Sequence, residues 1–194
     1  MFEINMMTSS VRNIIIGNII LIICCAFYLA WWMVAFKPEC AVKGMSSGWL
    51  LLPAAIAGIG AILVLVQSFR NATVDKSLIS GWLLMLIGVA AYFALLAVTY
   101  VCMHRMVTTE LLLIVGWCIL TLSEINVLYG LNALSLSGAI SWFVIVIISA
   151  AVSMICYMLY YSLDVVKGYI DGMIPLLIIA VVMLILTIWM ILKK

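Results

Sequence analysis

The segment TTELLLIVGWCILTLSEINVLYG, residues 108–130, is apolar and long enough to cross a lipid bilayer, yet it contains two glutamates, Glu110 and Glu124. A membrane span needs about 20 apolar residues, because the hydrocarbon core is ~30 Å thick and a helix rises ~1.5 Å per residue. A carboxylate in hydrocarbon is costly unless it is protonated, paired or in contact with water. The segment therefore predicts a membrane helix whose polar face is turned away from lipid.

The composition of the whole chain also indicates a membrane protein. Of the 194 residues, 69% are hydrophobic and 8% are charged, whereas a soluble domain has roughly 25% charged residues. So few charges cannot cover a surface in contact with water, and the lipid bilayer is the expected partner of most of the surface. The net charge of +2, with no basic run beyond Lys193 and Lys194, predicts no nucleic-acid partner.

Six apolar runs of spanning length follow one another along the chain, and the links between them are short. The predicted spans are 14–36, 48–68, 78–101, 108–130, 138–162 and 173–192. The first run is longer than the ~7–15-residue core of a signal peptide, and no small-residue cleavage site follows it, so we expect it to remain as a span. The predicted fold class is all-α, a bundle of six transmembrane helices in a single transmembrane domain over residues 1–194.

The distribution of Lys and Arg predicts the orientation, because cytoplasmic loops are richer in these residues. If the N-terminus is cytoplasmic, that side carries Arg12, Arg70, Lys76, Lys193 and Lys194. The opposite side then carries Lys37, Lys43, Arg105 and Lys167. This slight excess favours cytoplasmic N- and C-termini in a protein of the cell (inner) membrane. Cys40 and Cys102 would flank loops on the opposite side, where a disulfide between them is one alternative.

The second and sixth spans differ in the size of their side chains. In the second span, Ala54, Gly58 and Ala61 recur at helical spacing, and small residues let helix backbones approach closely in lipid. We expect this span to be buried among its neighbours or to contact a second copy of the chain through its small-residue face. The sixth span is bulky all round, with Thr187 as its only polar side chain, and is expected to face lipid.

Four residues of the fourth span fall on one face of a helix. Fourteen residues separate Glu110 from Glu124, which corresponds to ~21 Å along a helix and to directions within ~40° of each other. Trp117 lies midway between the two glutamates, and Thr121 lies one turn before Glu124. Such a row should face protein or a water-filled cavity, where the aromatic ring and the carboxylate would serve a small solute or an ion.

Polar residues of the first two spans fall at a similar depth to Glu124. Asn18, Gln67 and Arg70 would meet Glu124 if the N-terminus is cytoplasmic. The candidate ligand- or ion-binding residues are Glu124, Trp117, Thr121, Asn18, Gln67 and Glu110. Two interpretations stay open, a proton- or solute-responsive site and an interhelical hydrogen-bond clamp. Near the start of its span, Glu110 has the further alternative of an interfacial carboxylate beside a basic residue.

Sequence signatures of enzymes are missing from the chain. There is no HExxH zinc motif and no phosphate-binding glycine loop, and His104 is the single histidine. The soft ligands in CMHRM, residues 102–106, are too few to favour a metal. We therefore predict no catalytic residues, no metal and no cofactor. The leading function is a transporter, channel or solute-binding membrane subunit for a small solute or ion. The main alternative is a non-catalytic structural or stress-response membrane protein, and an intramembrane enzyme is a distant third.

Overall fold

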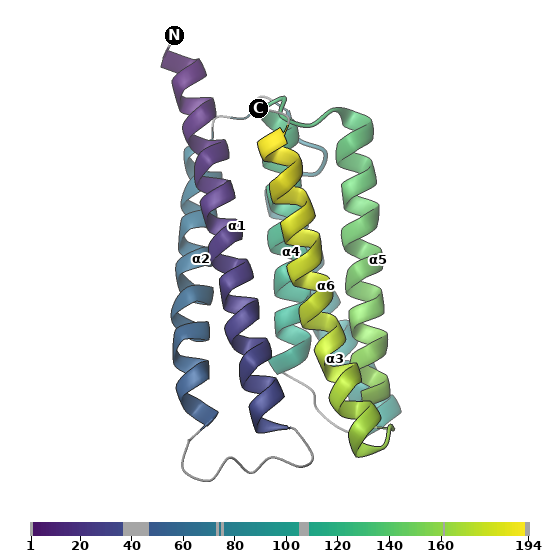
Figure 1. Ribbon diagram of the computed structural model, residues 1–194. Coiled ribbons are helices and arrows are strands. Elements are labelled where there is room, and N and C mark those ends of the chain that lie inside the picture. The colour runs from purple at the N-terminus through teal and green to yellow at the C-terminus, as the bar shows by residue number, and fades with distance from the viewer. Residues whose placement is uncertain are drawn as a thin grey trace. The chain divides into compact units, whose positions relative to one another are not determined.

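The computed structural model describes residues 2–36, 47–72, 74, 76–104, 109–160 and 162–192, without the side chains of 2–8, 47, 102, 103 and 109. The long helices are α1 (Phe2–Ala35), α2 (Leu51–Asn71), α3 (Gly81–Met103), α4 (Thr109–Gly130), α5 (Leu136–Tyr160) and α6 (Val165–Leu192), and the 3₁₀ turn η1 (Ser47–Leu50) precedes α2 (Figure 1). All six contain a segment long and apolar enough to cross a membrane. The all-α prediction is confirmed, and the chain is a multi-pass integral membrane protein.

Two of the helices are longer than their predicted spans. Helix α1 begins at Phe2 rather than near residue 14, and α6 begins at Val165 rather than at 173. The sequence argument ended each span where polar residues begin, but a helix can continue beyond the hydrocarbon because its hydrogen bonds are internal. The 28 residues of α6 correspond to ~42 Å, which is longer than the ~30 Å core. Cys40 and the side chain of Cys102 lie outside the described parts of the chain.

The chain divides into two compact units, and each is described by itself. Unit 1 comprises Met1–Ala72 and Ile155–Lys194, and unit 2 comprises Thr73–Met154. Helices α1, α2 and α6 belong to unit 1, and α3 and α4 belong to unit 2, while the boundary falls inside α5. That the chain forms a single transmembrane domain stays a prediction.

In unit 1, α1 runs along α2 and their backbones approach each other closely (Figure 1). A Cβ atom at Gly17 would lie 2.7 Å from two carbon atoms of the fully buried Leu65 side chain. About two turns after Gly17 on α1, the Cys24 thiol donates a hydrogen bond to the Ala54 carbonyl of α2 at 3.1 Å. A Cβ at Gly58 would lie 3.2 Å from the sulfur of Cys24. The small-residue face of α2 is therefore covered by α1 of the same chain.

The remainder of α2 does not fit the expectation of a buried span. Ile56, Ile59 and Leu63 are all more than half exposed, so within unit 1 only one side of α2 is covered. A contact between two copies of the chain would have to use residues of α2 other than Ala54, Gly58 and Ala61. The small residues indicated a close helix contact correctly but not which helix makes it.

The expectation that the sixth span faces lipid is wrong for one of its sides. Helix α6 packs against α1 in unit 1. Its buried residues recur every three or four positions, which is the period of one helix face, and they are Gly168, Asp171, Pro175, Ile179, Val182, Met183, Leu186, Thr187 and Met190. The sequence could not reveal this face, because a helix that is apolar all round shows no contrast between its lipid side and its protein side.

In unit 2, α3 packs against α4, and the two helices meet at another glycine. A Cβ at Gly88 would lie 2.5 Å from Cγ1 of Ile119. Of the most apolar stretch of α4, 56% of the residues are buried, against 11% in α3. Helix α4 ends in a Schellman motif: the N–H of Ala133 donates to the Leu128 carbonyl, and Asn132 has a left-handed φ of 56°. Helix α4 is thus the most buried of the six spans.

We expect Gly17→Ala to destabilise the α1–α2 contact, because the added methyl group would displace the buried Leu65. Overpacking of this kind costs ~1–3 kcal/mol, which outweighs the ~1 kcal/mol by which alanine favours a helix over glycine. The matched control is Gly60→Ala, since a Cβ at that position meets nothing within 4 Å. Thermal unfolding of the purified protein in detergent should show a lower midpoint for Gly17→Ala only. Equal midpoints would contradict the close approach.

Candidate functional site

The four residues predicted to share a face of the fourth span, here called the polar row, are Glu110, Trp117, Thr121 and Glu124. All four lie within α4. Glu124 and Thr121 are fully buried and Trp117 is 6% exposed, while Glu110, in the first turn of α4, is partly exposed. The structure therefore places three members of the row away from the exposed surface and leaves Glu110 near the helix end, as its position in the sequence indicated.

The indole of Trp117 has an unusual environment within the polar row. Its Nε1 atom is buried and has no hydrogen-bond partner among the described residues. The carbonyl of the same residue accepts a hydrogen bond from Thr121 Oγ1 at 2.9 Å. Buried N–H groups are nearly always paired, since an unpaired one loses its hydration without compensation. The indole N–H is therefore available to an acceptor group on a water molecule or a bound solute.

Asn126 holds the segment that leads into α3 by its side chain. Its Oδ1 accepts hydrogen bonds from the backbone N–H groups of Leu78, at 2.7 Å, and Ile79, at 3.4 Å. Its Nδ2 donates to the Ile79 carbonyl at 2.8 Å. Close by, a Cβ at Gly130 would lie 2.5 Å from the carbonyl oxygen of Lys76. The last turns of α4 are thus fastened to the chain just before α3.

The role of Asn126 was missed by the sequence analysis. The available signal was an amide two residues after Glu124 in an otherwise apolar turn, but the partners of an asparagine cannot be read from one sequence. Backbone groups at residues 78 and 79 precede the first turn of α3 and have no helical partner there, and the asparagine side chain supplies both a donor and an acceptor. The residue is part of the architecture of unit 2.

The residues predicted to join Glu124 from the first two spans lie in unit 1, and their burial differs. Asn18 is fully buried, next to the close contact at Gly17. Gln67 and Arg70 are exposed. Because the buried Leu65 marks the side of α2 that faces α1, a residue two positions later points roughly 200° away from it. Within unit 1, Gln67 therefore points away from α1, and its place in the site stays a prediction. The grouping of Asn18 with Glu124 stays a prediction, since the two belong to different units.

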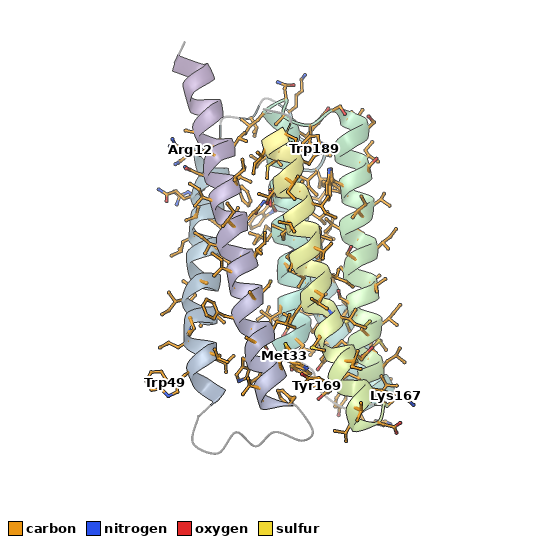
Figure 2. All side chains as sticks on the ribbon, in the orientation of Figure 1. Arg12, Met33, Trp49, Lys167, Tyr169 and Trp189 are labelled. Carbon is orange, nitrogen blue, oxygen red and sulfur yellow. The ribbon has the colours of Figure 1, made fainter. Side chains whose placement is uncertain are left out.

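Aromatic residues connect the C-terminal end of α1 to α6 in unit 1. Trp32 Nε1 donates a hydrogen bond to the Tyr169 carbonyl at 3.1 Å, and the Tyr169 hydroxyl donates to the Met33 carbonyl at 3.4 Å. Figure 2 shows Met33 and Tyr169 next to each other at this end of the two helices. Each helix thus donates one side-chain hydrogen bond to the backbone of the other.

Among the residues that the structure describes, no group of three or more His, Cys, Asp or Glu side chains lies close enough together to hold a metal ion. Known proteins offer no further guide: no protein-family model, curated protein or solved structure matches this chain significantly. The function of the chain therefore has to be argued from its own residues.

We expect Asn126→Ala to lower the free energy of unfolding by ~1–3 kcal/mol, because it leaves the backbone groups of Leu78 and Ile79 without their partner. The control is Ser123→Ala. The Ser123 hydroxyl donates to the Ile119 carbonyl of its own helix at 2.8 Å, and such back-bonding adds little stability. Denaturation of both variants in mixed micelles would check this. A Ser123→Ala effect as large as that of Asn126→Ala would refute the fastening role.

Proposed function

We propose that this protein is a small transporter, channel or solute-binding membrane subunit, and that the polar row of α4 lines its path or its binding site. The observation that carries the proposal is the complete burial of Glu124 inside a helix that is long and apolar enough to cross a membrane. Ionisable residues within spans are expensive, and they are typical of substrate, ion or proton pathways. Glu124 lies in α4, the span with the largest share of buried residues, and this position supports a role in a solute or ion pathway.

Within this function, each residue of the row has its own role. Glu124 is the titratable or cation-binding group, and Thr121 lies one turn away along the same face. Trp117 supplies an aromatic wall and, through its buried Nε1 atom, a donor for an acceptor atom of the solute. Glu110 lies at the N-terminal end of the row. In the proposed path, its carboxylate would attract cations to that end.

The alternative is a non-catalytic structural or stress-response membrane protein, and one observation favours it. Polar side chains of α4 outside the row are used for architecture: Asn126 fastens the segment before α3, and Ser123 bonds to its own helix. If no water reaches the polar row, its polar side chains serve only to hold helices together. Access of water to the row therefore separates the two functions.

We expect a cysteine at position 121 to react with a small charged thiol reagent added to membranes, because a transport path contains water. The background is the chain with its six native cysteines replaced by alanine. Leu122→Cys is the matched control, since Leu122 is 6% exposed and points ~100° away from Thr121 on the same helix. Mass spectrometry after labelling should show modification at 121 and none at 122. Protection of both positions would establish a dry row and overturn the proposal.

We further propose that both termini are cytoplasmic, in agreement with the slight excess of Lys and Arg on that side. Reporter proteins that are active only in the cytoplasm, fused after Lys194 or inserted between Asn71 and Lys76, should both be active. The same reporter inserted at Asp164, in the link between α5 and α6, should be inactive. Activity at Asp164 together with silence after Lys194 would mean the opposite orientation.

A further inference from the structure

Asp171 is a buried carboxylate that the polar row does not involve. The sequence analysis placed it in a link between spans, but the structure places it inside α6 with 9% of its surface exposed. Asp164, seven residues earlier, is exposed and pairs with Lys167 at 3.2 Å. In contrast, Oδ2 of Asp171 has no hydrogen-bond partner in the described parts of the chain. A buried carboxylate oxygen without a donor is a strong acceptor that lacks its complement.

One weak donor and one acceptor without its helical partner lie close to the Asp171 carboxylate. The nearest described side chain with a donor is the Cys156 thiol of α5, and a thiol is a weak donor. Four residues after Asp171, Pro175 lies inside α6. Because proline has no N–H, the Asp171 carbonyl loses the hydrogen bond that an α-helix would normally give it. Asp171 therefore has two acceptors that lack a strong hydrogen-bond donor, the side-chain Oδ2 atom and the main-chain carbonyl oxygen.

An aromatic wall lies against Gly172, the residue that follows Asp171. A Cβ atom at Gly172 would collide with the six-membered ring of Trp32, and the Trp32 indole is fixed by its hydrogen bond to the Tyr169 carbonyl. Trp32 also contacts Tyr160 edge to face, with ring centroids 5.6 Å apart, and stacks on Phe36 at 4.4 Å. Aromatic faces attract cations, so this wall and the carboxylate favour the same sign of charge.

We propose that Asp171 and the rings of Trp32 and Tyr160 form a binding site for a primary ammonium group. A single carboxylate balances a single positive charge, and no cluster of metal-ligating side chains exists among the described residues. A primary ammonium carries three N–H donors, which match the unpaired Oδ2 atom and the freed carbonyl, whereas a quaternary ammonium has none. The proposal uses residues of unit 1 alone and does not depend on the function proposed for the polar row of α4.

Two sources can supply this chemistry, the headgroup of phosphatidylethanolamine and a small soluble amine. The site lies within the first turns of α6, and its Trp32 lies three residues before the end of α1 at Ala35. Tryptophan and tyrosine are typical of the headgroup level at helix ends, which is where an ethanolamine headgroup would be found. The shared group is the ammonium, and the experiment has one arm for each source.

The first arm measures lipid retention by native mass spectrometry of the full chain, with phosphatidylethanolamine and phosphatidylcholine of equal acyl chains offered together. We expect about a tenfold preference for phosphatidylethanolamine, the gain typical of a charge-assisted hydrogen bond. Asp171→Asn should abolish the preference, and Asp164→Asn, at an exposed position, should keep it. The second arm compares the thermal midpoint of the wild-type protein in ethylammonium chloride and in tetramethylammonium chloride at equal ionic strength.

The outcomes separate the sources and can reject the site. A lipid preference without a midpoint shift assigns the headgroup, and a shift by ethylammonium that Asp171→Asn removes assigns a soluble amine. If the wild-type protein shows neither, there is no ammonium site at Asp171, and this result needs no variant to fold. A preference that survives Asp171→Asn would place ammonium recognition elsewhere and would likewise overturn the proposal.

Discussion

Hydrocarbon offers neither donors nor acceptors, so a chain that crosses it must satisfy its polar groups from within. The hydroxyls of Ser68, Ser123 and Thr187 each donate to the carbonyl four residues earlier in their own helix, at 2.7 to 2.8 Å. The Asn126 side chain forms hydrogen bonds with backbone groups of Leu78 and Ile79, just before α3. Against this background of internal pairing, three buried atoms have no hydrogen-bond partner in the described residues, namely Trp117 Nε1, Ser153 Oγ and Asp171 Oδ2.

The parts of the structure that were predictable depend on regular repetition along the sequence. Span number follows from length and hydropathy, because the bilayer thickness sets how many apolar residues are needed. The burial of Glu124, Thr121 and Trp117 follows from the cost of polar groups in lipid together with the helical period. Ala54, Gly58 and Ala61 indicated a close contact for a similar reason, since only small residues allow it.

The parts that were not predictable depend on contacts between residues far apart in the chain. The charged residues Asp164 and Lys167 predicted that Asp171 lies in a loop. No feature of the neighbouring sequence indicates that α6 begins before Asp171. The partners of Asn126 lie 47 and 48 residues away. The exposure of Gln67 within its unit was not predictable either, because the depth of a residue in a span does not tell which side of the helix a neighbour covers. Hydropathy separates membrane from water but does not distinguish lipid from protein.

The close approaches at Gly17, Gly88 and Gly172 also determine how this sequence can vary over evolutionary time. At each of them a neighbouring side chain occupies the volume that a methyl group would need, so no other amino acid fits without movement of that neighbour. Ile56, by contrast, is 64% exposed, so any apolar residue of similar size fits at that position. We expect natural variants of this chain to differ at such exposed apolar positions and to keep these three glycines. Identical residues between variants would then be few and would include these glycines.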